Sequence, residues 1–300
     1  MKIGVMGAGA VGSFYGALLA RAGHEVVLIG REAHVAAIRQ QGLQLSSQGE
    51  THTIPLHADT SPAALVDATL VLCCVKSPDT LQTAREMGPH LAPEARILSL
   101  QNGIDNLAAL RSLLPHTVSA AVVYAAVGLA GPGQLEHRGG GELVMAGDAL
   151  DAAGFRAFDD AGIAVRISPA IEEELWSKLV LNCAWNALSA ITQIPYRALH
   201  AATGIVETMR AVMNECLAVA AAEGVQLDAA LWSRIEGIAE RMPQQTSSTA
   251  QDLARHRRTE IDFINGAILR RADAHGIPVP ANRMLHALVK LLEDRPGLPG

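Results

Sequence analysis

Near its start the sequence reads Lys2-Ile3-Gly4-Val5-Met6-Gly7-Ala8-Gly9-Ala10-Val11-Gly12, a short apolar run that leads directly into closely spaced glycines. The small residues from Ser13 to Arg21 indicate a helix, and Glu25 to Ile29 indicates a second strand. A G-x-G-x-x-G spacing alone is a weak signal, but between the strand and the helix of one compact βαβ unit it is typical of dinucleotide binding. The N-terminal half is therefore predicted to be an α/β domain of the Rossmann type.

The glycines of this loop have different physical roles. Gly7 permits the tight turn, Gly9 lets a pyrophosphate approach the backbone, and Gly12 lets the helix lie close to the sheet. The free N–H groups and the dipole of the helix N-terminus would then bind the phosphates. The alternative is a glycine-rich turn without a ligand. The predicted cofactor-binding residues of the loop are Gly7, Ala8, Gly9, Ala10, Val11 and Gly12.

The end of the second strand indicates which dinucleotide is bound. NAD enzymes usually place an Asp or Glu there, which binds the ribose 2′-hydroxyl. This chain has Gly30-Arg31, followed by Glu32. A guanidinium can bind a 2′-phosphate through two hydrogen bonds, whereas a carboxylate would repel it. We therefore predict NADP as the cofactor, with Arg31 as a plain surface residue of a helix's first turn as the alternative.

Further strands follow, as an open sheet requires. Thr69 to Val75 and Arg96 to Leu100 are continuous apolar runs, which is typical of parallel strands buried on both faces. A hairpin is predicted from Leu43 to Ser47 and Glu50 to Ile54. His137 is expected to face solvent from an edge strand. The remaining elements are a buried strand, two antiparallel edge strands, a helix and a last strand, over residues 118–127, 134–137, 142–145, 149–160 and 163–167.

Polar residues follow two of these strands at their carboxyl ends. Lys76 comes directly after Val75, and Gln101-Asn102-Gly103 comes after Leu100. Ligands of open α/β sheets bind beyond the carboxyl ends of the strands. Lys76 and Asn102 are therefore expected to project towards the same crevice as the glycine loop. Either could instead be a loop residue or a helix cap, and Asn102 could serve only a turn with Gly103.

The pattern changes at Ser168-Pro169, where the domain boundary is placed, giving domains 1–168 and 169–300. After Ile171 the apolar residues recur with a helical period, and no strand signal appears. The second domain is therefore predicted to be all-α. Its helices are expected over about residues 172–193, 202–223, 228–240, 257–275 and 281–293.

The first of these helices carries a narrow polar stripe. Lys178, Asn182, Asn186 and Ser189 fall on one face, while the rest of the helix beyond Lys178 is almost entirely apolar. A helix that is mostly buried must turn its polar groups towards something polar. The stripe is therefore predicted to line a cleft. The alternative is an ion pair between Glu174 and Lys178 near a frayed first turn, with the asparagines bonded to neighbouring backbone.

Two polar segments near residue 250 complete the set of candidates. Residues 243–249 form a loop rich in hydroxyls and amides, and Thr259-Glu260-Ile261-Asp262 opens the fourth helix of this domain. Ser248 or Thr249 could merely cap a helical turn. Glu260 could merely be favoured by the dipole of the helix whose first turn it occupies.

Composition restricts the class of protein. The 300 residues suffice for two domains, and the net charge of −6, without a basic patch interleaved with aromatics, argues against nucleic acid as a partner. The four cysteines lack C-x-x-C pairing and lie in apolar runs, which indicates reduced thiols; no metal site is predicted. The longest apolar run is too short for a bilayer span, and Met1-Lys2-Ile3 leads straight into a strand without room for a signal peptide. We expect a soluble cytoplasmic protein that does not bind membranes.

Taken together, these residues resemble the ketopantoate reductase family (2-dehydropantoate 2-reductases) over nearly the whole chain. The resemblance implies an N-terminal Rossmann domain and an all-α C-terminal domain like that of 6-phosphogluconate dehydrogenase, with the active site between them. It rests on the glycine loop, Gln101-Asn102-Gly103, Lys178, Asn182, Asn186, and Ser248 followed by Thr259-Glu260-Ile261-Asp262.

The activity that this resemblance implies is NADPH-dependent reduction of ketopantoate to pantoate, a step of pantothenate biosynthesis. Lys178 would be the proton donor, because an ammonium can stabilise the charge that grows on the carbonyl oxygen. Burial would lower the pKa of Lys178, while a nearby Glu260 carboxylate would raise it. The resemblance also implies Glu260 as a second catalytic residue. The other implied residues are Asn182, Asn186, Ser248 and Glu260 around the substrate, Asn102 at both cofactor and substrate, and Arg31, Lys76, Ala126 and again Glu260 at NADPH.

Two positions depart from the family pattern. Ala187 stands where proline is frequent, and Tyr196 where some members have a further asparagine, so the acyl group of the 2-oxo acid substrate stays open. A related NADP-dependent reductase of another 2-oxo acid is one alternative. An NADP-binding sensor without turnover is another, although it would not need the lysine–amide stripe. The sequence leaves the oligomeric state open, with a homodimer as one candidate.

Overall fold

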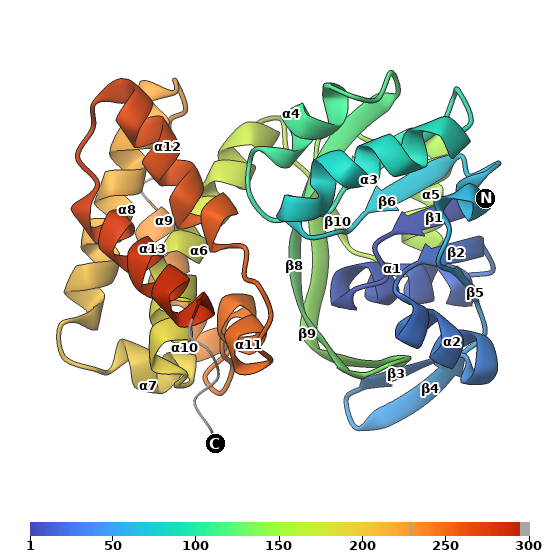
Figure 1. Cartoon of the computed structure of the whole chain (residues 1–300), viewed down its shortest axis with the longest axis horizontal. Coiled ribbons are helices and arrows are strands. Elements are labelled where there is room, and N and C mark those ends of the chain that lie inside the picture. Colours follow the sequence, from blue (N-terminus) through green and yellow to red (C-terminus); the bar gives the residue numbers. More distant parts are fainter. Residues whose placement is uncertain (229, 295–300) are drawn as a thin grey trace. The chain divides into compact units, whose positions relative to one another are not determined.

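The structure is a computed structural model that describes residues 1–228 and 230–294. Its internal contacts divide the chain into two compact units, Met1–Ile171 and Glu172–Gly300 (Figure 1). The first unit is built on a sheet with helices, and the described part of the second is helical. The predicted fold class, a Rossmann domain followed by an all-α domain, is confirmed.

The first unit contains one mixed sheet. Its strand order is β4-β3-β9-β8-β7-β6-β1-β2-β5, and β10 pairs with β9. The pairs among β1, β2, β5, β6, β7 and β8 are parallel, as the βαβ pattern predicts. The strands are β1 (Lys2–Met6), β2 (Glu25–Ile29), β3 (Leu43–Ser47), β4 (Glu50–Ile54), β5 (His57–Asp59), β6 (Leu70–Cys73), β7 (Arg96–Ser99), β8 (Thr117–Gly131), β9 (Gln134–Met145) and β10 (Val165–Ile167).

Helices cover both faces of this sheet, so the central strands are buried on both sides. Along β6, Leu70 and Leu72 pack into the core beneath α1 and α5, while Val71 and Cys73 pack into the core beneath α3 and α4. This alternation explains why the sequence of β6 is continuously apolar. The helices of the first unit are α1 (Ala10–Arg21), α2 (Glu32–Gln41), α3 (Thr80–Met87), α4 (Asn106–Arg111) and α5 (Ala152–Asp160).

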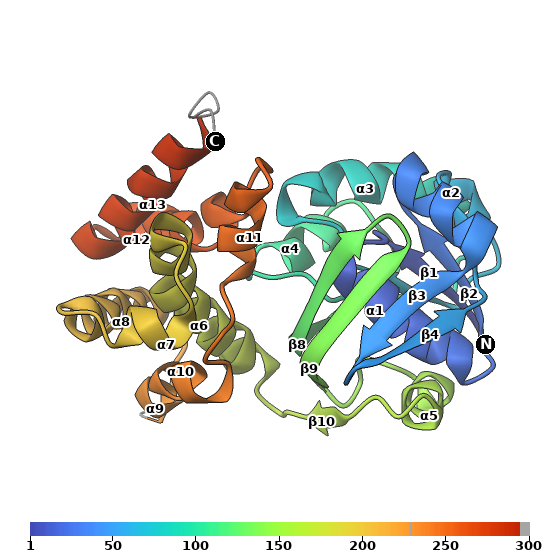
Figure 2. The same cartoon turned by 90° about the horizontal axis from the view of Figure 1, so that it is seen from below.

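The prediction of two antiparallel edge strands after residue 131 was wrong. They form one strand, β9, which lies between β8 and β3 and is therefore not an edge (Figure 2). Gly139, Gly140 and Gly141 break the alternation that marks a strand, and the register with β8 shifts beside them. His137 does not simply face solvent, since its ring stacks on Phe14 with centroids 4.6 Å apart.

The second unit packs around α6 (Ile171–Thr192), whose residues from Trp176 to Ala190 are nearly all buried. Three helices differ from their predicted ranges. The helix predicted over 202–223 begins at Ile205, the one predicted over 228–240 is split into two, and the one predicted over 257–275 begins only at Asn265. Residue 229, within the predicted 228–240 helix, lies outside the described residues. The other helices are α7 (Tyr196–His200), α8 (Ile205–Ala222), α9 (Leu231–Glu236), α10 (Ile238–Arg241), α11 (Ser248–Ala254), α12 (Asn265–His275) and α13 (Pro280–Glu293).

The sequence also led to expectations about the cysteines and about membrane-spanning helices. The four cysteines are free thiols, of which Cys73, Cys183 and Cys216 are buried and Cys74 is half-buried. Over residues 1–228 and 230–294, the structure contains no helix that combines the length and the apolar character needed to cross a bilayer.

Candidate active site

The glycine loop joins β1 to α1 and is held against the end of β2. The N–H groups of Gly7 and Ala8 both donate to the carbonyl oxygen of Ile29, at 3.0 and 2.7 Å. Gly7 has a φ of +107°, and a Cβ built there would lie 2.6 Å from the backbone nitrogen of Val75. Only glycine therefore fits at this turn.

Gly12 and Gly9 differ sharply in the space around them. A Cβ on Gly12 would collide with the carbonyl oxygen of Gly7 and lie 2.8 Å from the Val5 side chain, so α1 can approach the sheet only with glycine there. A Cβ on Gly9 would have no described atom within 4 Å. Gly9 is also the residue before α1, and within the described structure no side chain caps that helix. The loop thus offers open backbone N–H groups of the kind that bind phosphate.

Arg31 stands where the sequence predicts contact with a 2′-phosphate. It is the residue before α2, its side chain is exposed, and its carbonyl oxygen accepts from the N–H groups of His34 and Val35, each at 3.0 Å. A Cβ built on Gly30 would lie 2.7 Å from the Cβ of Ala8. The end of β2 therefore touches the glycine loop, and Arg31 follows directly.

Lys76 and Asn102 belong to neighbouring loops, because β6 and β7 are adjacent parallel strands. The Ser77 hydroxyl donates to the carbonyl oxygen of Asn102 at 3.0 Å, which ties the two loops together. The half-buried side-chain amide of Asn102 has no hydrogen-bond partner in the described part of the chain. Ala126 lies on β8 opposite Gly139, beside the irregular stretch of β9.

In the second unit, the predicted stripe lies on α6. Asn182 is 6% exposed and Asn186 is 5% exposed, yet over the described residues neither side-chain amide has a hydrogen-bond partner. Buried amides normally find partners, because leaving them unpaired costs about 1–3 kcal/mol each. These two retain donors and acceptors for a ligand. The sequence alternative, in which the asparagines bond to neighbouring backbone, does not describe this structure.

Lys178 lies on the same face of α6, one turn before Asn182. It is half-buried, and burial lowers the pKa of its ammonium from 10.5 to about 8, with a further lowering by the Arg234 guanidinium. Arg234 also forms an ion pair with Glu174 at 3.7 Å. Of the two opposing effects expected on the pKa of Lys178, burial prevails, and the Arg234 guanidinium acts in the same direction.

Ser248 is brought next to this stripe by its neighbour Ser247. The Ser247 hydroxyl donates to the carbonyl oxygen of Asn186 at 3.2 Å, and the Ser247 N–H donates to the hydroxyl of Ser189 at 3.0 Å. Ser247 also accepts from the N–H of Ala250 and so caps α11. The alternative in which Ser248 or Thr249 caps the helix does not describe this structure, and the exposed Ser248 has no capping role.

Glu260 does not occupy the first turn of a long helix, as the sequence suggested. It precedes a short 3₁₀ turn, Ile261–Phe263, and α12 begins only after it. The segment before it is bound to α13, where the Glu293 carboxylate accepts from the N–H and the hydroxyl of Thr259, at 2.7 and 2.5 Å. The N–H groups in the first turn of a helix have no partner within that helix, and this tertiary contact supplies one for Thr259.

Asp262 binds α13 as well, and we call these contacts of Thr259 and Asp262 with α13 the clamp. Asp262 accepts from Lys290 at 3.0 Å and lies 2.8 Å from His286, so both ends of Thr259–Asp262 are bound to α13. The sequence analysis did not predict these contacts between residues 259–262 and α13. It also did not predict the buried side chains that surround Asn102, such as Asn106. The only available signal was the run of polar residues at helical spacing on α13, which equally fits a solvent-exposed face.

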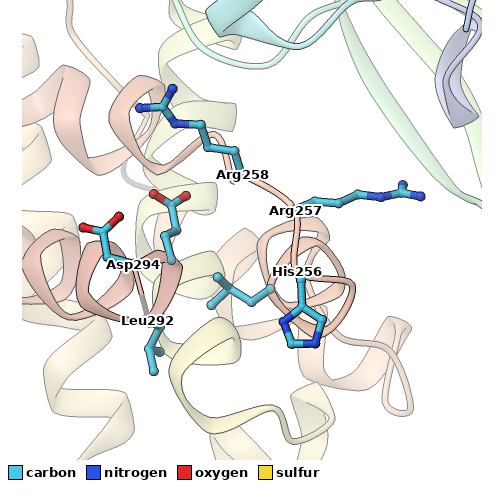
Figure 3. A pocket seen from close by; sticks show the side chains of 7 residues that line it. His256, Arg257, Arg258, Leu292 and Asp294 are labelled. Atoms are coloured by element: carbon cyan, nitrogen blue, oxygen red, sulfur yellow. The ribbon is translucent and has the colours of Figure 1, made fainter. Parts of the chain in front are cut away.

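A pocket of ≈ 560 Å³ adjoins this clamp, since Glu293 is one of its lining residues. In Figure 3 the Arg257 and Arg258 side chains extend away from each other. Its described lining contains none of the predicted catalytic or substrate residues, so it is distinct from the candidate site. The lining residues are Leu253, His256, Arg257, Arg258, Leu292, Glu293 and Asp294.

Comparisons with known proteins bear on both units. Residues 3–148 match the family model "Ketopantoate reductase PanE/ApbA", and residues 170–293 match its C-terminal counterpart. A 2-dehydropantoate 2-reductase of Halobacterium salinarum is 33% identical over 98% of this chain and 99% of its own length.

Solved structures of similar proteins cover the same extent. A PanE/ApbA family ketopantoate reductase from Ralstonia eutropha JMP134 is 55% identical, with a TM-score of 0.94 over 98% of this chain and 99% of its own. A D-mandelate dehydrogenase, in a ternary structure with NADH and anilino(oxo)acetate, is 28% identical with a TM-score of 0.92 over 98% and 99% of the two chains. The likeness therefore extends over the whole of both units.

Proposed function

Because the chain belongs to the ketopantoate reductase family, we propose that it reduces 2-dehydropantoate (ketopantoate) to pantoate with NADPH, with Lys178 as the general acid. The reaction is a step of pantothenate and coenzyme A biosynthesis. The full-length likeness to proteins of that name supports the chemistry. The choice of NADPH and the roles of individual residues rest on the geometry of each unit.

The first unit fits a nicotinamide dinucleotide. The open backbone at Gly9 and the uncapped N-terminus of α1 can bind the pyrophosphate, and Arg31 follows the adjoining strand end. An exposed guanidinium at that position favours a 2′-phosphate, since it can bind the phosphate by charge-assisted hydrogen bonds. When bound, the cofactor supplies the hydride that reduces the ketone carbon.

The second unit supplies what the substrate needs. The Lys178 ammonium would stabilise the negative charge that grows on the carbonyl oxygen and then transfer its proton to that oxygen. A pKa of about 8 keeps the lysine mostly protonated near neutral pH and makes the transfer easier than from an ordinary lysine. Asn182 and Asn186 would hold the hydroxyl and carboxylate oxygens of the substrate without competing for the proton.

One observation carries this proposal: two nearly buried amides without partners lie on the same helix face as a lysine of lowered pKa. A binding protein that only sensed NADP would have no use for a costly arrangement of this kind. The test is a steady-state assay of the purified chain, with ketopantoate and each of NADPH and NADH. Turnover with a kcat/KM much higher for NADPH supports the proposal, while NADPH binding without turnover of any 2-oxo acid would support the sensor.

A second candidate is the reduction of a 2-oxo acid with an aryl group, using NADH. The likeness to D-mandelate dehydrogenase favours it, and Tyr196 stands where some family members have an asparagine. The Tyr196 ring is buried and meets the Trp185 ring edge-on, with centroids 4.9 Å apart. The same assay with benzoylformate in place of ketopantoate distinguishes the two, because the preferred acid will have the higher kcat/KM.

A further inference from the structure

A connected set of buried side chains lies beneath the two loops that carry Lys76 and Asn102. We call it the amide lattice; its members are Ser77, Thr80, Ser99, Gln101 and Asn106. None of them is more than 9% exposed. The lattice joins the end of β6, the start of α3, the end of β7 and the start of α4. Neither the proposed chemistry nor the residues predicted from the sequence include Thr80 or Asn106.

Gln101 occupies one end of the lattice and uses both ends of its amide. Its Nε2 group donates to the carbonyl oxygen of Val75 at 3.0 Å and to the hydroxyl of Thr80 at 2.7 Å. Its Oε1 accepts from the hydroxyl of Ser99 at 3.0 Å. The Thr80 hydroxyl oxygen accepts a hydrogen bond from Gln101, so its own O–H donates to a different partner.

The direction of every later hydrogen bond follows from this. The Thr80 hydroxyl donates to Oδ1 of Asn106 at 2.8 Å, which fixes the orientation of the Asn106 amide. Nδ2 of Asn106 then donates to the carbonyl oxygen of Asn102 at 2.6 Å and to the Ser77 hydroxyl at 3.1 Å. The Ser77 hydroxyl is a second donor to the same carbonyl oxygen of Asn102.

We propose that the amide lattice positions Asn102 and Lys76 for the cofactor, with Asn106 as the residue through which it acts on Asn102. Asn106 touches no ligand; it is a positioning residue that holds the Asn102 backbone, so that the free amide of Asn102 projects beyond the strand ends. Ser77 follows Lys76 directly, and the same donors therefore fix the start of that loop. This inference rests on the proposed binding of a dinucleotide by the first unit.

The sharpest variant is Asn106→Asp, which keeps the shape of the side chain. The carboxylate keeps the acceptor for Thr80, but it turns an oxygen towards the Asn102 carbonyl oxygen where Nδ2 stood. Two acceptors facing each other repel, so the Asn102 backbone must move. We expect the Kd for NADPH, measured by titration of its fluorescence, to rise about tenfold, which is the scale of one misplaced hydrogen bond. Protonation of the new carboxyl group restores one hydrogen-bond donor, so the Kd of this variant for NADPH should fall again as the pH is lowered.

A pair of variants at Thr80 keeps the test decisive if Asn106→Asp does not fold. Thr80→Val retains the shape but removes the hydroxyl that orients Asn106, whereas Thr80→Ser retains the hydroxyl. The matched control is Thr83→Val, since Thr83 is also buried on α3 but its side chain makes no hydrogen bond to any described residue. We expect the Kd for NADPH to rise about threefold or more in Thr80→Val, and to stay near the parental value in Thr80→Ser and Thr83→Val.

The inference is overturned if Thr80→Val and Thr83→Val have the same Kd for NADPH, or if folded Asn106→Asp binds NADPH as the parent does. Because binding is measured directly, the outcome does not depend on which 2-oxo acid is reduced. A parent that binds NADPH but turns over no substrate would refute the proposed activity and leave the lattice test intact. A parent that binds neither NADPH nor NADH would refute both.

Discussion

Replacing Lys178 by methionine should greatly slow catalysis and stabilise the protein at the same time. Methionine has a similar length and carries no charge. The pKa of Lys178 falls from 10.5 to about 8 on folding, which means that the folded chain disfavours the ammonium. At about 1.4 kcal/mol per pKa unit, the penalty is at most about 3.5 kcal/mol. Lys178→Met removes this penalty, so its free energy of unfolding at pH 7 should exceed that of the parent by up to this amount.

The pH dependence of the gain follows from the two pKa values. Below about pH 8 the lysine is protonated in both the folded and the unfolded chain, and the penalty is complete. Between pH 8 and 10.5 the folded chain loses the proton first, so the stability of the parent rises relative to Lys178→Met. The difference between the two proteins should therefore shrink across this window. An ordinary exposed ion pair of Lys178 with Glu174 would instead make Lys178→Met less stable, by about 0.3–0.5 kcal/mol.

Two measurements check the prediction. Urea unfolding of parent and variant at pH 7 and near pH 10 gives the two differences in free energy, and single-turnover hydride transfer is followed by NADPH absorbance at saturating 2-oxo acid. We expect the rate to fall on the order of 10²–10⁴ while NADPH binding is retained. Hydride transfer at nearly the parental rate would remove Lys178 from the chemistry. A variant that is less stable than the parent at pH 7 would refute the electrostatic reasoning.

Three further predictions concern residues around the proposed site. Arg31→Ala should raise the KM for NADPH about tenfold or more and leave the KM for NADH nearly unchanged, since only NADPH has a 2′-phosphate; equal effects on both cofactors would contradict the assigned role. Glu260→Ala should raise the KM for the 2-oxo acid in steady-state assays, whereas lower thermal stability with unaltered kinetics would limit Glu260 to a structural role. Glu293→Gln should lower the free energy of unfolding by about 1–2 kcal/mol through weaker bonds to Thr259 and Lys290, and urea titrations would detect it.

The Glu293 clamp also has a defined pH window. Burial raises the pKa of Glu293, but the hydrogen bonds from Lys290 and Thr259 outweigh it and hold that pKa below its usual value of 4.5. The stabilisation is therefore complete above pH 4.5 and is lost as the pH falls through the lower folded value. The stability difference between the parent and Glu293→Gln should follow the same course and shrink in acid.

The sequence by itself determined the features that depend on local spacing. The glycine loop, the apolar strand β6 and the polar stripe of α6 could each be predicted, because each is written in a short window whose period or glycine spacing has one physical meaning. Asn182 and Asn186 are polar residues in an otherwise apolar stretch of helix, and this contrast indicates a candidate site from the sequence alone.

Only the tertiary structure decided which distant segments meet. Thr259 is bound to Glu293 at the far end of α13, and β9 lies inside the sheet because β3 pairs with its outer side. The amide of Asn106 is oriented by Thr80, from another helix. In each case the local sequence fits two conformations of similar free energy, and a hydrogen bond to a residue far along the chain selects one of them.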